Sequence, residues 1–352
     1  MSEKGIKVLI LSHPLSLFHY LYHRNLKRLK LYFNLDRKGE NLYSYTPFSI
    51  FPLTDRLNMG TLGIYFSIWS IVPSLKSMLT KWGFNKVDVL WITNHNLYYV
   101  SKFISYSAIV SRITDDPDAW LRTNRTIKKF LDMSINHSDL VLTTAFSLKS
   151  RYMNMNSNTF CIPNGVDFQH FSTVNSEIPK EKYQYSDKPW VIYIGAIHSW
   201  FDVELLVRVA QQLPYLNFIL IGPVSINIDI FKTLSNIKIL GPRPYSDLPS
   251  YLKFARVGII PFRDTKLVKS VSPIKMIEYL AAGLPVVSTP MPEALQLAPP
   301  IKFAHNSMEF ADAIRSYLIC PPPKEELQIY ACRHSWENRY NEIYKLIENI
   351  LN

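Results

Sequence analysis

The chain has 352 residues, of which 47% are hydrophobic, and a formal net charge of +11. This length suits two α/β domains better than one core of common size, and a mean hydropathy near zero indicates a globular protein rather than a membrane-spanning or disordered one. Its three cysteines have no metal or redox spacing and indicate a reducing compartment: Cys161, Cys320 and Cys332. The first seven residues are polar and the apolar run after them is short, so we expect no signal peptide.

The positive charge is concentrated in the first half of the chain. Residues 1–180 hold 21 Lys and Arg against 12 Asp and Glu, a net +9 of the total +11. A basic half suits an anionic membrane surface or an anionic acceptor, or it reflects a basic bias with no partner. No nucleic-acid motif accompanies the charge, so nucleic acid is not expected as a partner.

The first half begins with strand patterns that end in histidine-containing loops. Ile6–Leu11 is a continuous apolar run, typical of a strand buried on both faces, and His13 follows at its carboxyl end. Val87–Ile92 is a second clear strand pattern, with His95 just after it. Ligands of open α/β sheets bind at carboxyl ends of strands, so both histidines are acceptor-side candidates, although a loop histidine is often incidental. The first strand lacks the G-x-G-x-x-G turn, so we do not expect a dinucleotide.

Two stretches between these strands point toward a membrane surface. Residues 19–38 are basic and aromatic, and Leu57–Leu75 carries no charge but includes several polar residues and a proline. The second stretch is therefore a poor membrane span. It is predicted either as an interfacial element that dips into the headgroups or as a buried helix of the N-terminal domain.

Adjacent carboxylates follow a third strand. Ala108–Ile113 reads as this strand and ends before Thr114, Asp115 and Asp116. Two neighbouring carboxylates are unlikely to be buried unpaired, because desolvating them is costly. Either they act chemically, with one acid raising the pKa of the other toward that of a useful base, or one of them caps a helix that opens near Pro117.

The second half restarts the alternation of strands and helices. The polar stretch before Pro189 reads as a linker, and Trp190–Ile194 is a strand that ends in a glycine turn, Gly195-Ala196-Ile197. Further strands end at Gly222, at the loop Gly241–Tyr245 and at Pro261. The last stretch, Ser335–Leu351, has the apolar spacing of an amphipathic helix.

The segment Ser272–Thr289 concentrates the candidate chemistry. Ser272 and Pro273 predict a helix start, Gly283 a helix end, and Val286-Val287 a short buried strand. Lys275 and Glu278 are three residues apart and share one face of the first turn. A lysine at a helix N-terminus favours an anion such as phosphate, and the glutamate could accept from sugar hydroxyls. The alternative is an ordinary βαβ corner with a solvated Lys/Glu pair.

This segment resembles the donor-site signature of GT-B glycosyltransferases, which runs Glu, three residues, a small residue, Gly, any residue, Pro, Val. The matching residues are Glu278, Ala282, Gly283, Pro285 and Val286. The large retaining family has a second glutamate eight residues earlier, where this chain has Ser270. A lysine three before the glutamate resembles instead the teichuronic-acid-type and xanthan glucuronosyltransferase-type branch, in which that lysine contacts the nucleotide phosphates.

The resemblance implies roles for other residues. It implies a donor site that includes the turn after the first strand of the second domain, the loop that faces the nucleotide base, and cations for the phosphates: Gly195, Ala196, Ile197, Gly241, Arg243, Arg263, Ser272, Lys275 and Glu278. It implies that Asp115 or Asp116, in an Arg-x-Ser/Thr-Asp-Asp context, is the catalytic base. The retaining family has an arginine after the glycine and a lysine before the helix, where this chain has Ala196 and Phe201, so Lys275 and Arg263 are the expected phosphate ligands.

We therefore predict an α/β protein of the GT-B fold, with two Rossmann-like doubly wound domains facing a cleft. The predicted parts are an acceptor-binding domain (1–172), a linker (173–189), a nucleotide-sugar-binding domain (190–332) and a terminal helix (333–352) that packs back on the first domain. The predicted activity is transfer of a sugar from a nucleotide-sugar donor, taken to be UDP-linked, to a lipid-linked or cell-envelope polysaccharide acceptor. We expect no metal and no cofactor, and a cytoplasmic protein peripherally associated with the inner face of the membrane.

Two other functions fit the same sequence. A GT-B-fold nucleotide-sugar epimerase would need neither acceptor nor membrane, and the absence of a glutamate at position 270 makes a catalytically inactive partner subunit conceivable. Stereochemistry stays open, because the lysine version of the motif favours inversion and its terminal half favours retention.

Overall fold

In the computed structural model the chain divides into two units by the contacts that its residues make. Unit 1 contains Met1–Leu142, Arg151–Phe160 and Lys345–Asn352, and unit 2 contains Thr143–Ser150 and Cys161–Tyr344. Residues 143–150 and 161–172, which the sequence prediction assigned to the N-terminal domain, thus group with unit 2. The structure describes residues 5–17, 35–51, 60–117, 125–173, 178–185 and 187–352.

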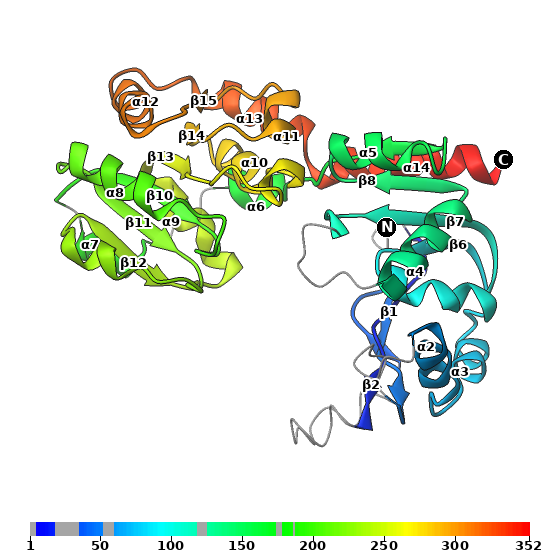
Figure 1. Ribbon diagram of the computed structural model, residues 1–352. Helices are drawn as coiled ribbons and strands as arrows, with labels where there is room; N and C mark the ends of the chain where they lie inside the picture. The colour runs from blue at the N-terminus through cyan, green and yellow to red at the C-terminus, as the bar shows by residue number, and fades with distance from the viewer. Residues whose placement is uncertain (1–4, 18–34, 52–59, 118–124, 174–177, 186) are drawn as a thin grey trace. The chain divides into compact units, whose positions relative to one another are not determined.

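Unit 2 is built on one sheet of six parallel strands, which Figure 1 shows in green to orange. In spatial order the strands are β12 (Ile237–Gly241), β11 (Asn217–Ile221), β10 (Trp190–Ile194), β13 (Ala255–Ile260), β14 (Val286–Ser288) and β15 (Lys302–Phe303). Every residue of β10 and β11 is buried. This is the expected state of continuous apolar strands in a parallel sheet that helices cover on both faces.

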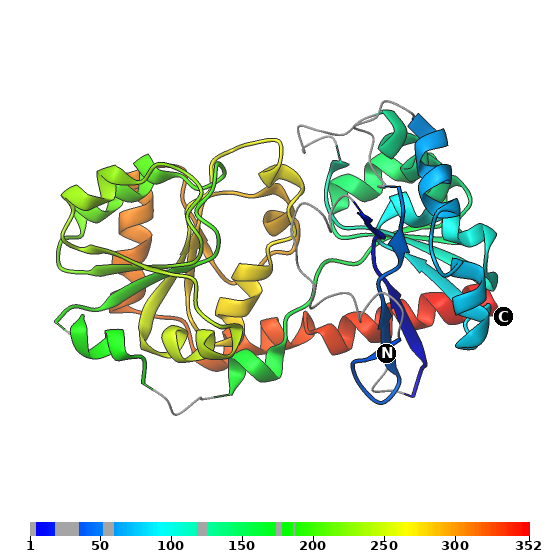
Figure 2. The same cartoon turned by 90° about the horizontal axis from the view of Figure 1, so that it is seen from below.

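The helices of unit 2 form two groups around this sheet. They are α6 (Phe168–Ser172), α7 (Lys180–Gln184), α8 (Val203–Gln212), α9 (Leu248–Phe254), α10 (Ile274–Ala281), α11 (Pro292–Gln296), α12 (Ser307–Ile319) and α13 (Lys324–Arg333). The chain moves from β10 to β11 in one direction and from β13 to β14 in the other. Right-handed crossovers therefore place α8 and α10 on opposite faces. Helix α12 packs with α8, while α6 and α13 pack with α10, and α9 packs with α6 (Figure 2).

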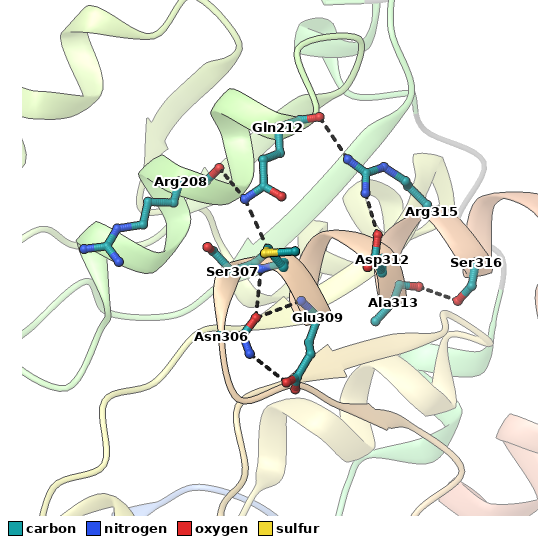
Figure 3. A network of polar contacts seen from close by, with 10 residues as sticks. Arg208, Gln212, Asn306, Ser307, Glu309, Asp312, Ala313, Arg315 and Ser316 are labelled. Atoms are coloured by element: carbon teal, nitrogen blue, oxygen red, sulfur yellow. Dashed lines mark hydrogen bonds and ion pairs between the residues drawn. The ribbon is translucent and has the colours of Figure 1, made fainter.

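A polar network fixes the contact between α8 and α12 (Figure 3). Asn306 caps α12, because its Oδ1 accepts from the backbone N–H groups of Met308 and Glu309, each at 3.0 Å. Arg315 pairs with Asp312 at 2.5 Å and donates to the carbonyl oxygen of Gln212 at 3.3 Å. The network thus ties the end of α8 to the middle of α12 on the face of the sheet away from α10.

The described residues of unit 1 form three smaller sheets. A four-stranded sheet has the order β6 (Lys86–Ile92), β7 (Ser105–Ile113), β8 (Leu140–Thr143) and β9 (Thr159–Cys161), and β6 and β7 are parallel. A three-stranded sheet has the order β1 (Val8–Leu11), β4 (Leu42–Tyr45) and β3 (Asp36–Arg37), and β2 (Leu15–Ser16) pairs with β5 (Phe48–Ser49). The prediction that the first strand is buried on both faces is wrong: Ile10 is 50% exposed, because one side of β1 is open to solvent.

Helical segments accompany these sheets: α2 (Gly60–Trp69), α3 (Leu75–Lys81), the 3-10 helix η4 (His95–Lys102) and α4 (Arg125–Asn136). Most of α5 (Phe146–Tyr152) and the first part of α14 (Trp336–Leu351), up to Tyr344, group with unit 2. The last residues of α14, from Lys345, group with unit 1. Most of the predicted basic stretch 19–38 lies outside the described residues. Among the described helices, none has the length and apolar content needed to cross a membrane.

Candidate functional site

Lys275 lies where the strand order of unit 2 reverses. The chain leaves β10 toward β11 on one side, and β13 lies on the other side, so the carboxyl ends of β10 and β13 form the switch point at which open α/β sheets bind ligands. Lys275, in the first turn of α10, reaches both ends. Its Cε is 2.1 Å from the place that a Cβ on Gly195 would occupy, and its Nζ is 5.9 Å from the ring centroid of Phe262.

Three glycines with positive φ line the same edge of the sheet. Gly195, Gly222 and Gly241 stand at the carboxyl ends of β10, β11 and β12, with φ of +156°, +144° and +71°. A Cβ on Gly222 would lie 2.1 Å from the carbonyl oxygen of Gly195, and the N–H of Gly222 donates to the carbonyl of Gly241 at 3.0 Å. Only glycine permits so close an approach of the two chains. Because glycines occupy these positions, the edge of the sheet beside Lys275 presents backbone groups and no side chains.

Two buried tyrosines hold the turn after β10 in place. The Tyr193 hydroxyl donates to the carbonyl of Ala196 at 2.8 Å, and the backbone N–H of Ile194 donates to the Tyr279 oxygen at 2.7 Å. Ile197, in the same turn, is fully buried and forms a β-bridge with Val224. Because Tyr279 belongs to α10, its bond to Ile194 fixes the helix that carries Lys275 against β10, the strand that ends at Gly195.

Lys275 and Glu278 are both partly withdrawn from water. Burial lowers the pKa of Lys275, and the nearby Glu278 charge opposes that shift. Burial raises the pKa of Glu278, against the charges of Lys275 and His170. No ion pair of either side chain occurs within the described residues. A cation in this state gains more from a bound anion than a fully solvated one does, because less water has to be displaced.

Ser272 does not have the role that the sequence predicted. The prediction that it caps α10 is wrong: Pro273 occupies the N-cap position, with no side-chain cap. The Ser272 hydroxyl instead accepts from the backbone N–H of Asn164 at 3.2 Å, which ties the segment between β9 and α6 to the start of α10. The first turn of α10 thus begins without a competing side-chain acceptor, which suits an external anion.

An aromatic pair stands near Glu278. Tyr245 stacks on His170, with centroids 4.4 Å apart and planes at 13°, and His170 Nε2 lies 2.9 Å from the Tyr245 carbonyl oxygen. Burial, with the charges of Glu278 and Asp167, raises the pKa of Tyr245 to about 12. Tyr245 remains 51% exposed, so one aromatic surface stays open. Neither residue stands out in the sequence, where the one signal is the position of Tyr245 in a loop at a strand's carboxyl end.

The two predicted arginines differ in availability. Arg243 is engaged within the protein: its Nη2 lies 2.6 Å from a Glu181 oxygen and its Nε donates to the Tyr251 hydroxyl at 3.0 Å. Arg263 has an exposed side chain, and its backbone N–H donates to the Trp200 carbonyl at 2.8 Å, which joins the loops after β13 and β10. Of the two, Arg263 is therefore the arginine that can turn to a ligand without breaking an ion pair.

Comparisons with known proteins fit this geometry. Residues 188–319 match the model of the family described as Glycosyl transferases group 1. The structure of Anabaena Alr3699/HepE in complex with UDP has a TM-score of 0.62 at 17% identity, covering 86% of each chain. Sucrose-phosphate synthase from Thermosynechococcus elongatus has a TM-score of 0.71 at 14% identity, covering 99% of this chain and 90% of that one. The fold is that of the GT-B glycosyltransferases. The predicted fold class is confirmed.

A curated relative is similar over part of this GT-B chain. It is a Bacillus subtilis (strain 168) protein named as a teichuronic acid biosynthesis glycosyltransferase, TuaH. The two are 29% identical over 149 residues, which is 41% of this chain and 37% of TuaH. The match thus spans little more than a third of that relative's length. It agrees with the branch that the Lys275–Glu278 spacing indicated.

The GT-B chain carries its predicted acceptor-side residues in unit 1. Asp115 is exposed and accepts from the Thr114 hydroxyl at 3.2 Å, whereas Asp116 is 9% exposed and pairs with Arg151 at 2.9 Å. The two adjacent acids thus differ, one open to solvent and one bound to an arginine. The alternative of a helix cap near Pro117 involves residues beyond 117 that the structure does not describe.

The predicted histidines also lie in unit 1. His95 Nδ1 is 2.7 Å from the hydroxyl of the buried Ser134, and burial lowers its pKa to about 4. His95 is therefore neutral at neutral pH, and its ring is already engaged. His13 Nδ1 lies 3.2 Å from the Pro14 carbonyl oxygen. Neither observation assigns a role in binding an acceptor.

Glu293 of unit 2 caps a helix. Its carboxylate accepts from the backbone N–H groups of Phe146 and Ser147, at 2.6 and 3.0 Å, and from the Ser147 hydroxyl at 2.7 Å. These groups form the start of α5, and the glutamate is only 2% exposed. The described part of the chain holds no cluster of three His, Cys, Asp or Glu side chains arranged for a metal ion.

Proposed function

We propose that this chain is a glycosyltransferase that moves a sugar from a nucleotide-sugar donor, a UDP-linked one, to a lipid-linked or cell-envelope polysaccharide acceptor. The observation that carries the proposal is Lys275, a partly buried cation directly over Gly195 at the switch point of the unit 2 sheet. UDP in the HepE structure and the name of TuaH support the donor and the acceptor class respectively. We place the reaction in the cytoplasm, with the protein held peripherally at the inner face of the membrane.

To bind the donor, the site needs a group that holds the diphosphate anion and a group that accepts hydrogen bonds from the hydroxyls of the ribose or the sugar. In the proposed complex the diphosphate lies at the N-terminus of α10, where Lys275 neutralises the charge that develops as the bond between the anomeric carbon and the diphosphate breaks. Arg263 can add a second cation. Glu278, three residues along the helix, accepts from hydroxyls of the ribose or of the sugar. The exposed aromatic face of Tyr245 offers a stacking surface close to Glu278.

The acceptor half needs a base. A carboxylate takes the proton from the acceptor hydroxyl as its oxygen forms the new bond to the anomeric carbon, and the diphosphate leaves. Asp115 and Asp116 are the candidates. Asp115 is the exposed one, while Asp116 is bound to Arg151; we therefore assign proton removal to Asp115 and the orientation of the Asp-Asp segment to the Asp116–Arg151 pair.

The test is a thermal-shift titration with UDP and with a panel of nucleotide sugars, on the wild type and on Lys275→Ala. A ligand at a hundred times its dissociation constant stabilises the fold by about 2.7 kcal/mol, so we expect one nucleoside diphosphate to raise Tm clearly and the variant to lose this response. Lys269→Ala is the control, because Lys269 belongs to the short 3-10 helix Val268–Ser270 that precedes α10, and its side chain is 57% exposed in a surface ion pair with Asp264.

Each outcome has a clear meaning. Stabilisation of the wild type and of the Lys269 variant, but not of the Lys275 variant, supports the donor site. If no nucleotide stabilises the wild type, the donor site is refuted and the inactive-subunit alternative gains weight. If donor is bound and then converted with no acceptor present, the epimerase alternative replaces transfer.

A further inference from the structure

Helix α2 presents apolar side chains on two opposite faces. One face belongs to the core of unit 1, where Ile64, Ile68 and the nearby Ile71 are 5%, 6% and 3% exposed. The other face is open: Tyr65, Phe66 and Trp69 are 39%, 52% and 86% exposed. The two readings of the uncharged stretch Leu57–Leu75 are thus both present among its described residues, one on each face. A tryptophan with most of its surface in water is unusual for a side chain of this size.

A second segment extends this open face. Ile50 and Phe51 follow β5 and are 45% and 52% exposed. The N–H of Ile50 donates to the Ser70 carbonyl at 3.1 Å, the N–H of Phe51 donates to the Ser70 hydroxyl at 3.1 Å, and the Ser67 hydroxyl donates to the Phe51 carbonyl at 2.9 Å. These bonds fix the segment against the end of α2. We call the resulting surface the aromatic patch: Ile50, Phe51, Tyr65, Phe66, Trp69 and Val72.

A groove of about 490 Å³ runs into the aromatic patch between α2, α3 and Phe103. Its lining is almost entirely apolar and includes Phe66, Trp69 and Ile71, with Lys76 as its charged member. The patch is therefore wide enough, and hollowed enough, to admit more than single side chains. A contiguous apolar surface of this kind marks a place where something else binds.

The charge around the aromatic patch identifies what binds there. Lys102 Nζ donates to the Tyr65 hydroxyl at 2.9 Å and lies 4.8 Å from the centroid of that ring, and Lys76 lines the groove. Between residues 41 and 87 the sequence has four Lys and Arg but only one carboxylate, Asp55. Aromatic side chains bordered by lysines suit the headgroup region of an anionic bilayer, where rings enter the interface and ammonium groups meet phosphates.

We propose that the aromatic patch docks unit 1 on an anionic phospholipid surface, with Trp69 and Phe66 inserted among the headgroups and Lys76 and Lys102 facing lipid phosphates. This deepens the membrane association in the proposed function, on which its biological use rests, by naming the surface responsible. Docking there would keep the acceptor-side unit next to a lipid-linked acceptor without any membrane-crossing segment. The contact is non-covalent and reversible.

The experiment is co-sedimentation of the full chain with vesicles of phosphatidylglycerol mixed with phosphatidylcholine, and with vesicles of phosphatidylcholine alone. We expect binding to the anionic vesicles, and at least a tenfold lower partition coefficient for Phe66→Ser/Trp69→Ser, which corresponds to about 1.4 kcal/mol. Lys76→Gln should weaken binding less and reduce its salt dependence. The matched control is Met308→Ser/Ile319→Ser, which removes two equally exposed apolar side chains, 68% and 85%, from α12 of unit 2.

The fluorescence of Trp69 gives a second readout. The difference between the spectra of the wild type and Trp69→Phe isolates this indole, and we expect a blue shift and quenching by brominated lipid when anionic vesicles are added. An unchanged thermal unfolding midpoint would show that the variants fold, as expected for exposed positions.

Three results would overturn the proposal. The wild type could fail to bind anionic vesicles, the Phe66/Trp69 variant could bind as well as the wild type, or the patch could mediate dimers, seen as a concentration-dependent size that the variant loses while vesicles are ignored. Lys275→Ala keeps the patch intact and should bind vesicles normally. A wild type that binds UDP but not anionic vesicles would therefore refute this inference alone, and a wild type that binds anionic vesicles but no nucleotide would refute only the donor site.

Discussion

The first strand of the unit 2 sheet and the first strand of unit 1 show how differently the two units are built. All five residues of β10 are buried, and the turn that follows it is held by Tyr193 and Tyr279. None of the four residues of β1 is fully buried, and Ile10 is half exposed. One strand is enclosed by helices on both faces, and the other has a side in solvent.

This difference indicates which groups would determine ligand specificity in each unit. In unit 2 the ligand edge is backbone and glycine, shaped by contacts between β10, β11 and α10, so few side chains there can change without moving the main chain. In unit 1 the candidate residues are side chains at strand ends, such as Asp115, and apolar groups in solvent, such as Trp69. A donor with a constant nucleotide and diphosphate suits the first arrangement, and a variable acceptor suits the second.

The largest expected effect on stability is that of Gly222→Ala, which places a side chain at the glycine-lined edge of the unit 2 sheet. Its Cβ would lie 2.1 Å from the Gly195 carbonyl oxygen, and φ of +144° is unfavourable for alanine. Backbone must shift to relieve this contact, so we expect a loss of at least ~3 kcal/mol in the free energy of unfolding, measured by urea denaturation.

Gly241→Ala is the matched control for that substitution. Gly241 also has positive φ, +71°, but a Cβ there meets nothing within 4 Å. We expect a loss of only about 1 kcal/mol, the cost of a left-handed backbone for a residue with a Cβ. Equal losses of unfolding free energy in the two variants would show that the positive φ, and not the close approach of the chain ends after β10 and β11, causes the loss at Gly222.

A smaller loss is expected from Tyr279→Phe, which tests how α10 is fixed to β10. The substitution keeps the ring that packs against Gly258 but removes the oxygen that accepts from the Ile194 N–H. A buried N–H would be left unpaired, so we expect a loss of about 2 kcal/mol in unfolding free energy. We also expect weaker UDP stabilisation, because the helix that positions Lys275 loosens. Unchanged UDP binding in a destabilised variant would show that packing alone aligns the lysine.

The helix and strand around Lys275 were predictable because their signals are local. The spacing from Pro273 to Gly283 predicted α10, and the run after Pro285 predicted β14. The contacts that complete the site are not local: Ile194 and Tyr279 are 85 residues apart, and Asn164 and Ser272 are 108 apart. Ser272 shows the limit, because a serine before a helix reads as a cap whether it serves its own helix or, as here, a distant turn.

In unit 1 the sequence left alternatives that only side-chain exposure separates. The uncharged stretch Leu57–Leu75 was compatible with core or with interface, since composition says nothing about which face of a helix is covered. Asp115 and Asp116 were equivalent in the sequence, and they differ in the structure because Arg151, 35 residues from Asp116, reaches only one of them within ion-pair distance.

The Asp116–Arg151 pair should contribute less to stability than the bonds inside unit 2. Its side chains are 12% and 36% exposed, between a buried and a surface pair. We expect Arg151→Ala to cost about 1–2 kcal/mol in urea denaturation, because the ion pair between Arg151 and the mostly buried Asp116 is removed. Asp115→Asn should leave stability within about 0.5 kcal/mol but abolish transfer if it is the base. If Asp115→Asn retains full activity while Asp116→Asn, folded, has none, the assignment of the two acids is reversed.

The smallest expected effect is a pH dependence of stability that comes from one histidine in each unit, His95 in unit 1 and His334 in unit 2. Burial is the largest cause of the lowered pKa, about 4, of both rings; the charges of Arg339 and Arg333 add to it at His334. Since the unfolded pKa is near 6.5, the unfolded chain binds more protons between these values. The stability that each neutral ring contributes is complete above about pH 6.5 and is lost as pH falls toward 4.

For each histidine this amounts to about 1 kcal/mol between pH 7 and pH 5.5. We expect Tm to fall over this interval, and His95→Gln and His334→Gln each to flatten the fall. Ring titration by NMR gives the two pKa values directly. If His95 titrates near 6.5 while His334 titrates near 4, the interior of unit 1 around η4 admits water that unit 2 excludes, and the contrast seen between β1 and β10 extends to the polar groups of each unit.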